Sequence, residues 1–164
     1  MHVADEQRWE DHEAMVTLEE ITGVNIRAVL ALEVSKAQQA TYPRSNAYSI
    51  AEGSFPPDDD PVWMRAICED GRPIGFIMTS EAADFGDYFL WRMMIDERFQ
   101  GKGYGAAAIN LLVNRIKKNG NPRVLLLSHQ KDNLDAARFY EKLGFSYTGN
   151  NLDAGELEME LRFE

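Results

Sequence analysis

The feature that most constrains the fold is a glycine-rich segment between an apolar run and an amphipathic one. It reads Gln100-Gly-Lys-Gly-Tyr-Gly105, follows the apolar residues 89–95, and precedes residues 106–118, whose apolar side chains recur at helical spacing. Glycine lets the backbone bend so that successive N–H groups converge, and a helix N-terminus adds the positive end of its dipole. A strand, a glycine loop and a helix in this order predict a phosphate or diphosphate site.

This segment has three alternative interpretations: two other phosphate-binding loops and a connector without a ligand. Gly101, Gly103 and Ala106 formally satisfy the dinucleotide fingerprint, but that site needs an acidic residue about 20 positions later, and the next apolar run, 124–128, has none. The nucleoside-triphosphate loop needs Ser or Thr after Gly-Lys, where this chain has Gly103. A connector whose glycines serve only the turn geometry remains an alternative at this point.

The pattern along the chain predicts one mixed α/β domain with a sheet at its core. Residues 1–12 read as a flexible polar leader, and residues 13–164 as the domain. One helix is expected from Asn25 toward Gln39, and others over 45–52, 106–118 and 132–143. The predicted strands are 16–21, 62–69, 76–79, 89–95, 124–127 and 157–163, the last of them as an outer strand because apolar and charged residues alternate in it.

Charge and composition exclude several classes of protein. The formal net charge is −10, which argues against nucleic acid as a partner. Residues 1–90 hold 6 basic and 17 acidic groups, whereas residues 91–164 hold 11 and 10, so the two halves suit ligands of opposite sign, although uneven surface charge is an equal alternative. No stretch approaches the roughly 20 apolar residues of a membrane span. The single cysteine and the acidic start without an apolar signal region favour the cytoplasm.

Two motifs together resemble the coenzyme A site of GNAT-type N-acetyltransferases. The first is Ile95-Asp-Glu-Arg-Phe-Gln-Gly-Lys-Gly-Tyr-Gly105, and the second is Asn133-Leu-Asp-Ala-Ala-Arg-Phe-Tyr140-Glu-Lys-Leu-Gly-Phe145. The resemblance covers residues 75–163 well and the earlier residues only loosely. It implies a single domain with a central, mostly antiparallel mixed sheet flanked by helices, and acetyl-CoA as co-substrate. Residues 89–96 and the helix end at 34–42 further resemble the bacterial spermine/spermidine acetyltransferases.

The resemblance also implies which residues form the site. Tyr140 stands where the family has its tyrosine acid, and core packing is the alternative for this side chain. Asn133, Ala136, Ala137 and Tyr140 share one helical stripe, which leaves a groove for a cofactor arm. Main-chain N–H groups near Met94 and Ile95 are expected to stabilise charge on the acyl oxygen. The residues expected to bind the coenzyme are Met93, Met94, Ile95, Gln100, Gly101, Lys102, Gly103, Tyr104, Gly105, Asn133, Ala136 and Lys142.

The expected acceptor is a small cationic amine, with a polyamine such as spermidine or spermine as the favoured one. An alkyl amine has a pKa near 10.4, so the enzyme must attract a cation and then remove its proton. The carboxylates expected to do so are Glu33, Glu81, Asp84 and Asp87, with a solvated surface role as the alternative. Acetylation of an aminoglycoside, an amino acid or a protein lysine, and a non-catalytic acyl-CoA sensor, remain open. The three histidines show no metal-ligand spacing, so no metal is expected, and a homodimer is compatible with the predicted sheet.

Overall fold

A seven-stranded sheet forms the centre of the protein. The computed structural model describes residues 16–42 and 44–164, and the predicted leader lies outside them. The strands lie in the order β1-β2-β3-β4-β5-β7-β6. All neighbouring strands are antiparallel except β4 and β5. Their bounds are β1 Val16–Glu19, β2 Val62–Glu69, β3 Arg72–Ala82, β4 Asp87–Ile95, β5 Val124–Gln130, β6 Ser146–Leu152 and β7 Glu156–Arg162.

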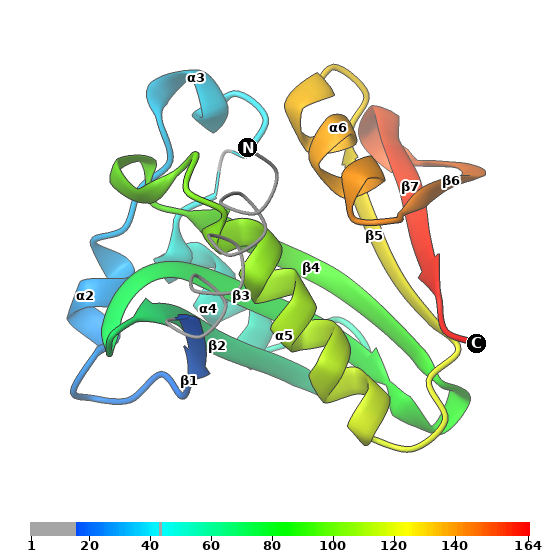
Figure 1. Ribbon diagram of the computed structural model, residues 1–164, viewed down its shortest axis with the longest axis horizontal. Helices are drawn as coiled ribbons and strands as arrows, with labels where there is room; N and C mark the ends of the chain where they lie inside the picture. The colour runs from blue at the N-terminus through cyan, green and yellow to red at the C-terminus, as the bar shows by residue number, and fades with distance from the viewer. Residues whose placement is uncertain (1–15, 43) are drawn as a thin grey trace, which may run out of the picture.

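Helices cover both faces of the sheet (Figure 1). On one face α5, Tyr104–Lys118, packs through Ile109, Leu112 and Ile116 against a core that extends to β5 and β7. On the other face α2, Ile26–Leu30, and α4, Asn46–Ser54, cover β2–β4. The remaining helices are α3 Lys36–Gln39 and α6 Leu134–Lys142, with short 3-10 turns η1 Ala83–Phe85, η2 Glu97–Phe99 and η3 Asp153–Gly155. Each layer therefore buries an apolar face of the sheet, as the α/β prediction requires.

The single parallel pair in the sheet comes apart along its length. β4 and β5 pair only from Asp87↔Val124 to Leu90↔Leu127, although both strands continue beyond these residues. At this point β4 has a bulge, since Arg92 pairs with Met78 and Leu90 with Thr79, which leaves Trp91 without a partner on β3. A bulge bends and twists a strand. β4 and β5 accordingly separate toward the top of Figure 1, where α3 and α6 lie on opposite sides of the opening.

The structure corrects two expectations about the elements. The expected helix from Asn25 to Gln39 is two short helices, because a new helix starts at Ser35. The Ser35 hydroxyl accepts from the Gln38 N–H, and the Gln38 side chain accepts from the Ser35 N–H. The expected outer strand, β7, lies between β5 and β6, so β6 forms this edge of the sheet and β1 forms the other. β6 is largely exposed and interrupted between Tyr147 and Asn151, so it has no alternating apolar pattern in the sequence.

Of the helices in the described part of the chain, none is long and apolar enough to cross a membrane.

Candidate active site

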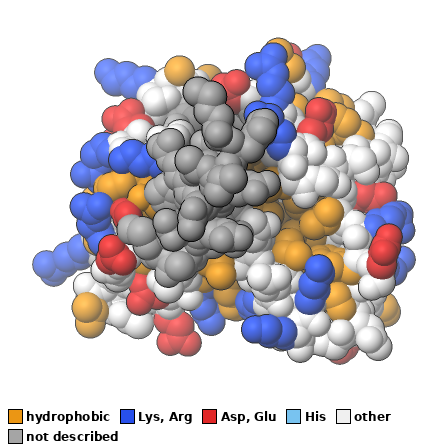
Figure 2. All heavy atoms as spheres, viewed as in Figure 1, with side chains coloured by type: hydrophobic (Ala, Val, Ile, Leu, Met, Phe, Trp, Pro, Cys, Tyr) orange, Lys and Arg blue, Asp and Glu red, His pale blue; other side chains and the backbone are white. Residues whose placement is uncertain are grey.

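A cleft of about 1100 Å³ opens where β4 and β5 separate. One wall is the segment Val34–Tyr42, which contains α3, and the opposite wall is α6. The floor is the end of β4, and the glycine loop 100–105 closes one end. In the same view, Figure 2 shows hydrophobic side chains gathered at the surface between α5 and the β5–β7 strands. A long apolar cleft with a polar loop at one end is suited to an elongated ligand with an anionic end.

The glycine loop has the geometry that an anion site needs. Gly103 precedes α5 with φ +86°, a left-handed conformation that side chains other than glycine rarely adopt. It has no side-chain cap, and the N–H groups of Gly105 and Ala106 follow in the first turn, where N–H groups have no carbonyl partner within the helix. A Cβ on Gly105 would lie 3.1 Å from Phe139 Cζ, so glycine also permits the close approach of α5 and α6.

The end of β4 presents main-chain N–H groups to the cleft. Asp96 N–H donates to Ile74 O on β3 at 2.9 Å, and successive N–H groups along a strand point to opposite sides. The N–H groups of Met93 and Ile95 therefore point away from β3, toward the side that β5 has left. The N–H of Met94, expected to face the cleft together with that of Ile95, instead points to β3. Donors in this position suit an amide-like arm or a developing oxyanion.

Tyr140 lies in the α6 wall of the cleft, against two aromatic rings. Its ring centroid is 5.0 Å from that of Phe139 and 5.5 Å from that of Phe145, both edge-on. Burial raises the pKa of Tyr140 well above its usual value of 10.0, and proximity to Tyr42 on the opposite wall raises it further. The phenol therefore keeps its proton at neutral and moderately alkaline pH, so its hydroxyl is able to donate to a group that enters the cleft.

Most residues expected to bind the coenzyme lie together in this cleft. The lining includes the predicted β4 residues Met93–Ile95, the loop residues Gln100, Gly101, Gly103, Tyr104 and Gly105, and the α6 residues Asn133, Ala136 and Lys142. Lys102 is not among the lining residues, and its Nζ lies 5.8 Å from the Phe99 ring centroid. Two others also have structural contacts: Asn133 Oδ1 caps α6 by accepting from Ala136 N–H, and the Tyr104 hydroxyl donates to Glu69 at 2.7 Å.

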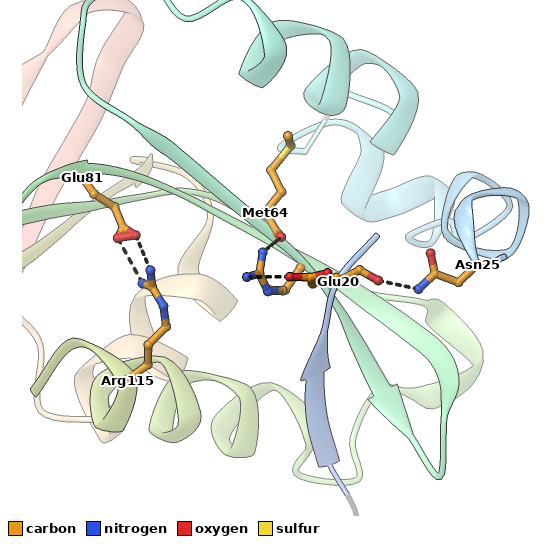
Figure 3. Close-up of polar contacts among 6 residues, drawn as sticks. Glu20, Asn25, Met64, Glu81 and Arg115 are labelled. Carbon is orange, nitrogen blue, oxygen red and sulfur yellow. Dashed lines mark hydrogen bonds and ion pairs between the residues drawn. The ribbon is translucent and has the colours of Figure 1, made fainter. Parts of the chain in front are cut away.

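The four carboxylates expected near the acceptor are not brought to this cleft. Glu81 is buried and faces α5, where both its oxygens bind Arg115 at 2.8 and 3.0 Å (Figure 3). Asp87 pairs with Arg123 at 2.6 Å, and Asp84 is exposed in η1. These three lie at the end of β3–β4 far from Met94 and Ile95. Glu33 is exposed, and its main chain rather than its carboxylate makes the contacts described below.

The α3 wall is the part of the cleft that the sequence did not identify as a site. From this wall, Gln38 and Tyr42 both line the cleft. The Tyr42 hydroxyl is buried and has no hydrogen-bond partner among the described residues, and burial raises its pKa to about 12 against smaller lowering effects of Arg92 and Ser49. The only local signal was the Ser35-x-x-Gln38 capping pattern, which marks a helix start and not a ligand.

Comparison with known proteins agrees with this geometry. Residues 27–145 match the family model described as "Acetyltransferase (GNAT) family". The spermine/spermidine N(1)-acetyltransferase of Bacillus subtilis (strain 168) is 27% identical over 140 residues, which cover 82% of this chain and 90% of that protein.

Solved structures share the fold. The PaiA N-acetyltransferase of Thermoplasma acidophilum, in complex with coenzyme A, has a TM-score of 0.67 and 17% identity over 90% of this chain and 99% of that one. The aminoglycoside acetyltransferase AAC(6')-Ib, in complex with coenzyme A, has a TM-score of 0.72 and 19% identity over 90% and 94%. Because the family model covers most of the chain and the cleft has the required loop, the protein belongs to the acetyltransferase (GNAT) family and is an acetyl-CoA-dependent acyltransferase.

Proposed function

We propose that this protein transfers the acetyl group of acetyl-CoA to a primary amine of a polyamine such as spermidine or spermine, by direct attack in a ternary complex. The observation that carries the proposal is one cleft with an anion-binding loop at one end and a partly buried, protonated phenol, Tyr140, in its wall. The diphosphate of the coenzyme fits the loop 101–106, and its arm fits between the end of β4 and α6.

Acetyl-CoA supplies a thioester carbon that an uncharged amine can attack, and the residues of the cleft assist at two points. The N–H groups of Met93 and Ile95 stabilise the negative charge that develops on the acyl oxygen. When the carbon–sulfur bond breaks, the Tyr140 hydroxyl gives its proton to the sulfur. The proton that the attacking nitrogen loses replaces it, so the overall reaction consumes one amine and releases one thiol. A positioned acid of this kind contributes roughly 100- to 10,000-fold to a rate.

The choice of a polyamine rests on charge and on the relative of known activity. The spermine/spermidine N(1)-acetyltransferase of B. subtilis aligns over 82% of this chain. The net charge of −10 attracts a polycation over distance. With the four predicted carboxylates away from the cleft, Glu156 and Glu158 are the acidic groups we now propose for recruitment: their partners Ser128, Thr148 and Asn150 are uncharged and leave their negative charge uncompensated, whereas Glu160 pairs with Arg162. Both lie on β7 on the face opposite to buried Met159, hence on the α2–α4 side of the sheet.

Substrate screening by thiol release tests this proposal. With acetyl-CoA, the protein should turn over spermidine or spermine with a kcat/KM at least ~100-fold above that for amino acids or a lysine peptide. Because recruitment is electrostatic, the KM for the polyamine should increase several-fold between about 50 and 500 mM salt. Faster turnover of an aminoglycoside or a peptide would assign a different acceptor, and tight coenzyme binding with no turnover of any amine would make the protein a sensor.

A further inference from the structure

Val34 and Tyr42, the two ends of the α3 wall, pack against the core, but the helix α3 between them is held by polar contacts. None of the four residues of α3, all of which the structure describes, is buried. A helix of this length is unstable by itself and is normally held by a buried apolar face. The wall nevertheless lines the cleft through Ala37, Gln38, Thr41 and Tyr42. The hydrogen bonds of α3 to the rest of the protein are therefore the contacts that fix where the helix lies between these two anchored ends.

One pair of side-chain amides joins this wall to the first residue of the glycine loop. Gln38 Nε2 donates to Gln100 Oε1 at 3.0 Å, and Gln100 Nε2 donates to Gln38 Oε1 at 2.9 Å. The two residues are 62 positions apart in the sequence, and the pair is partly buried. Gln100 Nε2 also donates to Ile95 O at 2.8 Å, so the same amide holds the end of β4. Three parts of the cleft thus meet at one pair of glutamines.

Both glutamines are held in place by further contacts. Gln38 Oε1 accepts from Ser35 N–H at 3.2 Å, which completes the capping box at the start of α3. On the approach to α3, Glu33 N–H donates to Asp96 Oδ2 at 3.0 Å, and Glu33 O accepts from Glu97 N–H at 2.9 Å. The segment 33–38 is therefore joined at both of its ends to the segment 95–100.

The Asp96 end of this connection is a charged, buried hydrogen-bond acceptor. Burial alone would raise the pKa of Asp96, but hydrogen bonds from Arg98 and from the main-chain N–H groups of Glu33 and Arg98 outweigh it, so its pKa lies below the ordinary value. The carboxylate is thus ionised at neutral pH and retains the Glu33 contact. The contact between Glu33 and Asp96 therefore persists at one end of the segment 33–38. The Gln38–Gln100 pair at its other end is the contact that a side-chain substitution removes.

We propose that Gln38 is a positioning residue that sets the α3 wall and the glycine loop in one register, so that binding of the coenzyme and binding of the amine both depend on the Gln38–Gln100 pair. This inference rests on the proposed function, which assigns the loop to the coenzyme and the space between β4 and α6 to its arm, and it adds that the amine enters on the α3 side of the cleft. Tyr140 and the N–H groups of β4 do not take part in the pair. Loss of the pair should therefore weaken both binding steps and leave the chemical step nearly unchanged.

The test compares Gln38→Met with Gln39→Met. Methionine keeps the length and most of the volume of glutamine and removes both amide contacts. Gln39 is the neighbouring residue of α3, does not line the cleft, and makes one exposed bond to Val34 O at 3.3 Å. Titration calorimetry gives the Kd for coenzyme A, and steady-state kinetics give kcat and both KM values. Circular dichroism and the Tm establish that each variant is folded, and Gln100→Met, which leaves the Ser35–Gln38 capping box intact, replaces Gln38→Met if the latter does not fold.

We expect Gln38→Met to raise the Kd for coenzyme A and the KM for the amine together, each by roughly tenfold, with kcat within about threefold. In the double variant Gln38→Met/Gln100→Met, the second substitution should raise Kd and KM by a smaller factor than Gln100→Met does alone, because both substitutions remove the same pair. Gln39→Met should match the wild type. If Gln38→Met binds and reacts like the wild type, even with a lower Tm, the positioning role is wrong while the proposed function stands. A wild-type protein that binds no coenzyme A would overturn both.

Discussion

Replacing Tyr140 with phenylalanine should lower kcat by about 100- to 1000-fold while the Kd for coenzyme A changes less than about twofold. The substitution removes only the hydroxyl, and the ring keeps its edge-on contacts with Phe139 and Phe145. Without the Tyr140 phenol, the sulfur leaves as a thiolate and lacks the proton that this hydroxyl supplies. Stopped-flow or steady-state thiol release, together with calorimetric titration of coenzyme A, measures both quantities.

Tyr48→Phe provides the control, because Tyr48 is an exposed phenol on α4, outside the cleft lining. The pH dependence provides a second check. Since burial raises the pKa of Tyr140, the acid stays protonated as the amine loses its proton. The wild-type rate should therefore increase with pH up to about 10 without an alkaline decrease. A kcat for Tyr140→Phe equal to that of the wild type would remove this residue from the mechanism.

Gly103→Ala should raise the Kd for coenzyme A at least ~10-fold. Gly103 has φ +86°, and a Cβ in the left-handed region costs about 1–2 kcal/mol, so the loop shifts toward another conformation. The N–H groups at the start of α5 then no longer converge on the diphosphate, which loses charge-assisted hydrogen bonds. Calorimetric titration with coenzyme A gives the Kd, and chemical denaturation gives the free energy of unfolding.

Gly149→Ala is a matched control for the cost of placing a Cβ on a residue with positive φ. Gly149 has the same φ of +86°, lies in the outer strand β6, and has open space where a Cβ would stand. Both variants should lose a similar amount of unfolding free energy, roughly 1 kcal/mol, and only Gly103→Ala should lose coenzyme affinity. Equal affinity in the two variants would mean that the loop does not form the diphosphate site.

The glycine loop and the α6 stripe were predictable because their signals are local. Strand 62–69 has the predicted bounds, and Asn133, Ala136 and Tyr140 line the cleft from one helix face as their spacing indicated. Helical spacing and a strand–glycine–helix order follow from backbone geometry alone, so they can be derived from the sequence without knowledge of tertiary contacts. The order of β6 and β7 depends on pairing between distant segments and is not available in this way.

The acceptor side could not be predicted from charge. The sequence shows that residues 1–90 are acidic, but not that Glu81 pairs with Arg115, 34 positions later, or Asp87 with Arg123, 36 positions later. A buried carboxylate with a bidentate arginine partner has its hydrogen-bonding capacity used within the protein. The same limitation concealed the Gln38–Gln100 pair, because a side-chain contact across 62 residues leaves no periodic pattern in the sequence.

A crystal structure of the protein with acetyl-CoA bound is the most direct test of the central claim. We predict diphosphate oxygens within about 3.2 Å of the N–H groups of residues 101–106, and the sulfur facing the Tyr140 hydroxyl between the end of β4 and α6. A coenzyme bound elsewhere, or a Tyr140 hydroxyl directed away from the sulfur into the Phe139 and Phe145 rings, would contradict it.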